Sequence, residues 1–121
     1  MVTYKLPLVC EVNVQEYLRK DGNSPYQKWF NSLDHLAAAK ITVAVSRLEL
    51  GSTSSIKWFG SFGEYKIYWG PGYRIYLAKE GKRLIILFGG GTKKTQKSDI
   101  KAAKRLFQEF KKRRMANKPK R

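Results

Sequence analysis

The fold is decided by a stretch in the middle of the chain, residues 63–88, which reads GEYKIYWGPGYRIYLAKEGKRLIILF. Polar and apolar residues alternate here with a period of two, which is typical of β-strands. Three strands are therefore predicted, at Glu64–Trp69, Tyr73–Ala78 and Arg83–Phe88, separated by glycine-containing turns. Because these turns are short, we expect an antiparallel meander. The third strand is apolar on both faces, so we expect it to be central in the sheet.

Upstream of the meander, the apolar residues follow a helical period. Ser24 and Pro25 are predicted to begin a first helix, because serine caps free backbone N–H groups and proline suits the first helical position. A second helix is predicted from Ala37 to Leu50, with Gly51 ending it. The two helices should form an antiparallel hairpin. The apolar face of the first helix consists of Tyr26, Trp29, Phe30 and Leu33.

The outer parts of the chain complete an α+β order of β-α-α-β-β-β-α. A first strand is predicted within Tyr4–Val14, and a further short strand is conceivable near Lys57–Phe59. Gly89–Gly91 is expected to end the sheet, and a final helix to follow over Lys97–Arg114. The helical hairpin would cover one face of a twisted antiparallel sheet and leave the other face more open.

One domain over residues 1–114 is expected, because 121 residues suit a single core. The remaining residues, 115–121, are predicted to form a basic disordered tail. The net charge is +16, which favours a polyanionic partner such as nucleic acid. Residues 1–60 hold seven Lys/Arg and five Asp/Glu, whereas residues 61–121 hold eighteen and four, so the charge gathers in the C-terminal half.

The rare residue types limit the chemistry that the chain offers. Cys10 is the single cysteine, which fits a reducing cytoplasm and excludes an intramolecular disulfide. His35 is the single histidine, which excludes a two-histidine ribonuclease mechanism, and it is expected in the loop between the helices. We expect no metal and no cofactor. No lipidation motif or membrane span is visible, so no membrane partner is expected.

Several motifs together resemble the HigB-like branch of the RelE/ParE toxin superfamily. They are SPYQKWFNSL at 24–33, KITVAVSRLELG at 40–51, GPGYRIY at 70–76 and GGGTKKTQKSDI at 89–100. The similarity runs over about residues 8–110. It implies the RelE-like fold and a toxin of a type II toxin–antitoxin system, with a HigA-like helix-turn-helix antitoxin, the ribosome and mRNA as partners.

The resemblance also implies a reaction. RelE-like toxins cut mRNA on the ribosome without a metal, by attack of a ribose 2′-hydroxyl on the adjacent phosphate. Arg74 matches the position of a phosphate-binding arginine, and Lys93 that of a second catalytic arginine. Lys66 matches a basic position on the preceding strand, and Lys94 adjoins Lys93. These four residues are the candidate catalytic set.

Each of these assignments has a plainer alternative. Arg74 could instead pair with Glu64 on the neighbouring strand. Lys66 shares a sheet face with Glu64, and a lysine crowded by other cations is a candidate base. Glycines before Lys93 would let the backbone approach a phosphate, and the following helix N-terminus favours anions. The family's Tyr or His at the start of the last helix aligns with Asp99, which could simply be a favourable first-turn charge.

RNA contacts are expected from aromatic and polar side chains around this centre. Tyr68, Tyr73 and Tyr76 are candidates for stacking on a base or donating a proton. Thr95 and Gln96 could cap the last helix or bind RNA, and Lys97, Lys101 and Lys104 would contact RNA from that helix. A gyrase-inhibiting toxin of the ParE type and an RNA-binding module without cleavage remain alternatives to the endoribonuclease.

Overall fold

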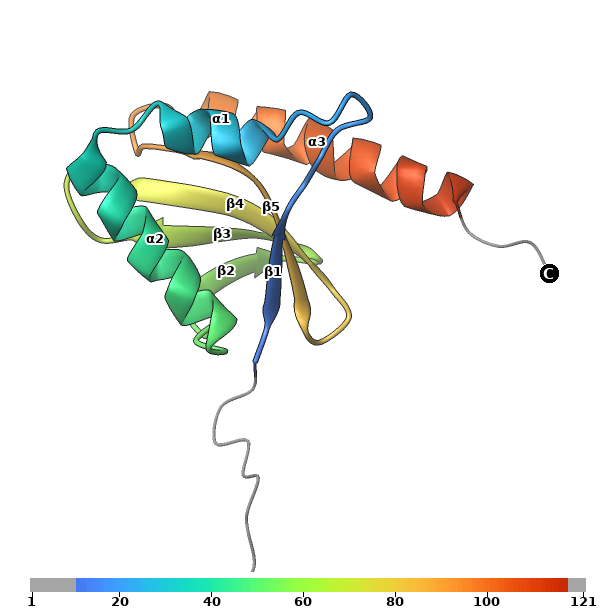
Figure 1. Cartoon of the computed structure of the whole chain (residues 1–121), viewed down its shortest axis with the longest axis horizontal. Coiled ribbons are helices and arrows are strands. Elements are labelled where there is room, and N and C mark those ends of the chain that lie inside the picture. The colour runs from blue at the N-terminus through green and yellow to red at the C-terminus, as the bar shows by residue number, and fades with distance from the viewer. Residues whose placement is uncertain (1–10, 118–121) are drawn as a thin grey trace, which may run out of the picture.

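The structure, a computed structural model that describes residues 11–117, is an α+β fold built on one five-stranded sheet (Figure 1). In chain order its elements are β1 (Asn13–Glu16), α1 (Pro25–Asn31), α2 (His35–Glu49), β2 (Ile56–Phe59), β3 (Phe62–Ile67), β4 (Tyr73–Glu80), β5 (Leu84–Gly91) and α3 (Gln96–Ala116). The α+β class is thus confirmed, and β2 confirms the additional short strand.

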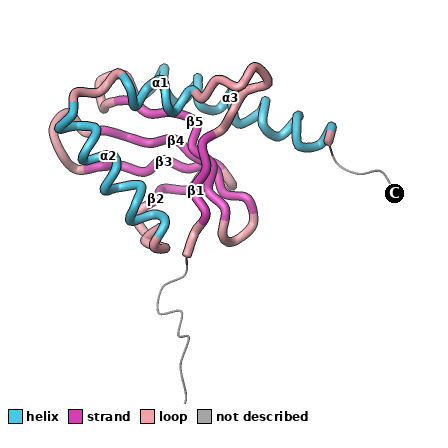
Figure 2. The backbone as a smooth tube through the Cα atoms, in the orientation of Figure 1, coloured by secondary structure: helices cyan, strands magenta, loops and turns pink. Residues whose placement is uncertain are grey.

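The strands lie in the order β1-β5-β4-β3-β2, as the magenta tubes of Figure 2 show. Strands β2 to β5 form the expected antiparallel meander, and β5 is an internal strand, between β1 and the central strand β4. The expectation of a wholly antiparallel sheet is wrong at β1. This strand runs parallel to β5, with Asn13 opposite Leu84, because the chain returns to β5 only after the helices and the meander. Most of the first strand predicted over 4–14 lies outside the described residues.

Helices cover both faces of the sheet, so the expected open face is wrong. On one face, Tyr26 of α1 and Ile41 and Leu48 of α2 pack in one apolar cluster with inward residues of the sheet. Figure 1 shows α2 crossing in front of the strands on this side. On the other face, α3 buries its apolar stripe, including Ala103 and Phe107, against a second cluster. The stripe of α3 needs this burial because it would otherwise lie in water.

Side-chain caps set the starts of the first two helices. The Ser24 hydroxyl accepts a hydrogen bond from the Gln27 N–H at 3.0 Å, as predicted. Asp34 caps α2 in the same way by accepting from the Ala37 N–H at 2.8 Å. Helix α2 therefore begins at His35, and the placement of this residue in a loop is wrong.

The glycine run does not end the sheet, because β5 continues through Gly91. A Cβ atom at Gly90 would lie 2.5 Å from the Trp29 ring, and one at Gly91 would overlap the carboxylate of Asp99. The glycines thus let α1 and α3 pack closely on opposite faces of the same strand.

Helix α3 continues to Ala116, so the predicted disorder at Met115 and Ala116 is wrong, and residues 118–121 lie outside the described part. The last turn is held by Arg113, whose Nη1 donates to the Leu18 carbonyl at 2.7 Å, and by an ion pair of Arg114 with Glu80. Among residues 11–117, no helix combines the length and the apolar character that crossing a bilayer requires.

Candidate functional site

Arg74 and Glu64 form a buried ion pair on the α3 face of the sheet. The Nε of Arg74 lies 3.4 Å from Oε2 of Glu64, without the geometry of a hydrogen bond. The two side chains are only 5% and 10% exposed. The Nη1 of Arg74 donates to the Gly72 carbonyl at 2.7 Å. The structure thus contains the pairing that the sequence left open, and the backbone of the Gly70–Gly72 turn orients the guanidinium.

Gln96 joins this pair to the start of α3. Its Nε2 donates to Oε2 of Glu64 at 2.6 Å, and the Tyr76 hydroxyl donates to the same oxygen at 3.5 Å. A buried carboxylate that accepts from an amide and a hydroxyl, beside a guanidinium, is well compensated for its lost hydration. Glu64 was missing from the predicted catalytic set. The signal for it lay in the sequence, because Glu64 was the alternative partner of Arg74 and strand alternation placed it on the same face as Lys66. The register of the structure puts it opposite Tyr76.

Tyr76 has no surface with which to stack on a base, so its predicted RNA contact is wrong. Its side chain is fully buried, and its ring lies parallel to that of Phe62, with centroids 6.3 Å apart. Burial, followed by the nearby negative charge of Glu64, raises the pKa of its hydroxyl far above the ordinary value. Tyr76 therefore belongs to the core under α3.

Lys93 lies against the turn that holds Arg74. The Lys93 N–H donates to the Pro71 carbonyl at 3.4 Å. A Cβ atom added to Gly72 would lie 3.6 Å from Cβ of Lys93 and 3.4 Å from Nη1 of Arg74. The structure thus brings Arg74 and Lys93 together at one end of the sheet. The side chains of Lys93 and Lys94 are exposed there.

Lys66 reaches the same end of the sheet by strand register, because it pairs with Arg74 across β3 and β4. Its ammonium group lies 4.7 Å from the ring centroid of Tyr68, which is 83% exposed. Lys66 and Tyr68 also line a cavity of about 380 Å³ with Lys40 and Arg47 of α2. The ammonium of Lys66 therefore leans toward Tyr68 at the rim of this cavity.

Tyr73 lies on the opposite face of the sheet from Arg74, because neighbouring residues in a strand point to opposite sides. Its ring packs against Trp69, with centroids 6.1 Å apart, and against Trp29 at 6.4 Å. It is half-buried beside the α1 and α2 cluster. The structure thus separates Tyr73 from the basic residues with which it was grouped.

The start of α3 differs from the expected capping. Thr95 occupies the N-cap position but makes no side-chain cap hydrogen bond, and its hydroxyl donates to the carboxylate of Asp99. Asp99 lies in the first turn of α3, where a negative charge is favourable. Gln96 contacts Glu64 instead of a backbone N–H. Further along α3, the predicted RNA-binding residues Lys97, Lys101 and Lys104 are all exposed.

Within residues 11–117, no group of three or more His, Cys, Asp or Glu side chains is placed to hold a metal ion. The site offers cations at one end of the sheet. Arg74 is buried there, Lys66 lies opposite it in the strand register, and Lys93 lies against the turn that precedes it. Lys94 is the exposed neighbour of Lys93 in the sequence. Such an arrangement can neutralise a phosphate.

Comparison with known proteins identifies a relative of this chain whose activity is not described. No family model matches the chain. An uncharacterized protein of Haemophilus influenzae is 44% identical over 88 residues, which cover 70% of this chain and 88% of the relative. Identity at this level over most of both chains implies a shared fold. The chain therefore belongs to the same protein family as this uncharacterized protein of H. influenzae.

Proposed function

We propose that the protein is the toxin of a type II toxin–antitoxin system, with a RelE-like fold of the HigB-like branch, and that it cuts mRNA on the ribosome. The observation that carries the proposal is the gathering of Lys66, Arg74 and Lys93 at one end of the sheet, on three different segments of the chain. These are positions that the resemblance to RelE-like toxins marks as catalytic. The net charge of +16 supports a polyanionic target.

The proposed reaction is phosphoryl transfer within the RNA. A ribose 2′-oxygen loses its proton and bonds to the adjacent phosphorus, and the bond to the 5′-oxygen breaks as that oxygen takes up a proton. The products carry a 2′,3′-cyclic phosphate and a 5′-hydroxyl. Arg74 and Lys93 would stabilise the charge on the phosphate, and Lys66 is the candidate base. Lys94 would add charge, and Tyr68 would stack on a neighbouring base.

The cellular setting follows from the same proposal. A cytoplasmic location fits a ribosomal target and the single cysteine. The partners would be the ribosome, mRNA and a HigA-like antitoxin. No cofactor is needed, because attack by the 2′-hydroxyl requires only proton transfer and positive charge.

An RNA-binding module without cleavage is the second candidate, and one observation favours it. Arg74 is buried and paired with Glu64, so a phosphate would have to approach through the few exposed guanidinium atoms or displace the pair. In addition, the position aligned with the family's Tyr or His is Asp99, whose carboxylate accepts the Thr95 hydroxyl. In that case the cations would bind RNA and leave its backbone intact.

Primer extension on cellular mRNA after induction tests the proposal. Wild type is compared with Lys93→Ala and with Lys82→Ala, a matched loss of one exposed lysine in the turn between β4 and β5. Discrete cuts within translated codons should appear with wild type and Lys82→Ala and fall about 100-fold with Lys93→Ala. Induction of the SOS response without mRNA cuts would instead indicate gyrase inhibition. Ribosome binding without cuts would indicate the RNA-binding module.

A further inference from the structure

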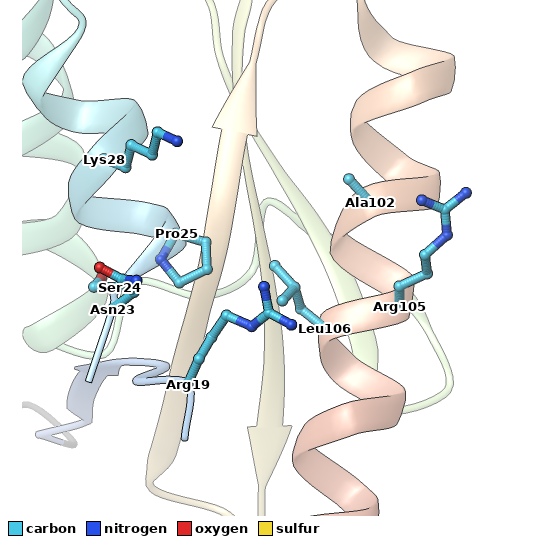
Figure 3. A pocket seen from close by; sticks show the side chains of 8 residues that line it. All are labelled: Arg19, Asn23, Ser24, Pro25, Lys28, Ala102, Arg105 and Leu106. Carbon is cyan, nitrogen blue, oxygen red and sulfur yellow. The ribbon is translucent and has the colours of Figure 1, made fainter. Parts of the chain in front are cut away.

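A second basic site lies away from the proposed centre, in a groove between the start of α1 and the middle of α3. Figure 3 shows the groove from close by, with the side chains of Pro25 and Leu106 between those of Lys28 and Arg105. The groove has a volume of about 550 Å³, within the range of small-molecule sites. Because β1 pairs with β5 only as far as Leu87, the glycine half of β5 has no strand neighbour on the β1 side among the described residues.

The charged side chains that line this groove are all cationic, and the uncharged polar residues Asn23 and Ser24 lie beside them. Arg19, Lys28 and Arg105 contribute charged ends, and no carboxylate lines the groove. Arg19 is already engaged, because its Nη2 lies 2.9 Å from Oε1 of Glu109. Within residues 11–117, Lys28 and Arg105 make no ion pair, and both side chains are exposed. Two cations therefore remain for a ligand, one on each wall.

The floor of the groove is apolar. Pro25, Ala102 and Leu106 supply it. A ligand that presents both anionic groups and flat apolar surface matches this combination. A ribonucleotide chain has that composition, with phosphates at regular intervals and a sugar and base between them.

The groove is also continuous with the charged surface of α3. Arg105 lies one turn from Lys101, which lies one turn from Lys97, and all three side chains are exposed. Lys104 lies instead on the side of α3 that faces β2 and β3, over the rings of Phe59 and Phe62. A strand leaving the groove would therefore meet further cations along α3 toward Lys93 and Lys94. The carboxylates of an acidic peptide would pair with Lys28 and Arg105, but its acidic side chains would make few apolar contacts with the floor of the groove.

We propose that this groove binds the sugar-phosphate backbone of single-stranded RNA, with Lys28 and Arg105 as the phosphate contacts and the Pro25–Leu106 floor against a sugar or base. The proposal rests on the proposed function in one respect, the choice of RNA as target. It does not require cleavage. The groove serves as an anchoring site that fixes the register of the strand relative to Lys93.

Fluorescence anisotropy with a labelled single-stranded RNA of about 12 nucleotides tests the proposal on the full chain. The double variant Lys28→Ala/Arg105→Ala is compared with Lys82→Ala/Arg83→Ala, which removes the same charge from the turn between β4 and β5. We expect binding about tenfold weaker for the groove variant and near wild type for the control. The slope of log affinity against log salt should fall by about 1.4 for two lost phosphate contacts.

Equal weakening by both variants would overturn the proposal, because the binding would then reflect net charge alone. A third variant, Leu106→Lys, adds charge but removes the apolar floor, and it should also weaken binding. Competition by polyglutamate as effective as that by RNA would instead assign the groove to an acidic protein. Cleavage is measured separately by primer extension. Loss of mRNA cuts in Lys93→Ala with RNA binding retained tests the proposed catalytic site. The groove variants test the proposed RNA-binding groove.

Discussion

The Nε of Arg74 lies 3.4 Å from Oε2 of Glu64, and the same oxygen accepts the amide of Gln96 from the first turn of α3. The pair therefore links the sheet to the helix that covers it. Removing one member of a buried pair leaves the other charged group without compensation. Such losses cost about 3–5 kcal/mol, whereas replacing both members by apolar groups is often tolerated.

We accordingly expect Arg74→Ala to lower the free energy of unfolding by about 3 kcal/mol. Arg74→Met combined with Glu64→Gln should recover a large part of that loss, because no buried charge remains unpaired. Arg83→Ala, an exposed matched control, should stay within about 0.5 kcal/mol of wild type. Urea denaturation of the purified variants measures all three. Equal stability of Arg74→Ala and Arg83→Ala would contradict a structural role for the pair.

Gly91 is expected to be intolerant of any side chain, because Asp99 occupies the space above it. Gly91→Ala should cost about 1–3 kcal/mol through this overlap. Asp99→Ala in the same chain should relieve most of the loss, so the double variant should be more stable than the sum of the single changes predicts. Thermal unfolding of wild type, the two single variants and the double variant gives the coupling energy between the two positions. Strict additivity would show that the two positions do not touch.

Stability should fall in alkaline solution because of buried tyrosines. Burial, with a smaller contribution from the charge of Glu16, raises the pKa of Tyr26 from 10.0 to about 12. Above pH 10 the unfolded chain loses this phenolic proton while the folded chain keeps it, so the unfolded state is favoured until the pH passes about 12. For each tyrosine with such a raised pKa, the free energy of unfolding falls by up to about 1.4 kcal/mol per pH unit in this range.

Tyr26→Phe should therefore flatten the decline in stability between pH 10 and 12. Tyr76 contributes in the same direction, since its pKa is also raised, so part of the decline should persist in the variant. Urea denaturation at a series of pH values gives the slope for each protein. Identical slopes for wild type and Tyr26→Phe would contradict a raised pKa of Tyr26 in the folded state.

Tyr68 offers a test of stacking that is separate from charge, because it is 83% exposed and contributes little to the core. Tyr68→Ala should weaken binding of single-stranded RNA about tenfold, within the range measured for base-stacking residues. Tyr68→Phe keeps the ring and should bind nearly as wild type does. Anisotropy titrations measure the affinities, and circular dichroism should show both variants folded. Loss of binding in Tyr68→Phe would point to the hydroxyl group instead.

The meander could be predicted because its signals are local. The alternation in β3 and β4, and the glycines between strands, lie within a few residues of one another. The parallel pairing of β1 could not be predicted in this way. Its partner Leu84 is about 70 residues from Asn13, and no local pattern reports which distant strand will lie alongside.

The charged residues of the candidate site could be predicted from the sequence, but the burial of Arg74 and Tyr76 could not. Glu64 was recognised as a possible partner of Arg74, yet Arg74 and Tyr76 were both expected to be available to RNA. Their burial depends on α3, whose apolar stripe was visible in the sequence but whose position over this face was not. Gln96 shows the same limit, because only the packed helix brings it to Glu64.

The pairing of β1 with β5 also orders the assembly of the protein during synthesis. Asn13 and its neighbours are synthesised well before residues 84–87, the segment of β5 with which they pair. The apolar residues of α1 and α2 are likewise buried only after the later strands of the sheet have been synthesised. The N-terminal half of a nascent chain therefore stays exposed to chaperones and proteases until most of the polypeptide has emerged. Chains released before Leu84 would lack β5, whose residues belong to the apolar clusters on both faces of the sheet, and could not complete the core.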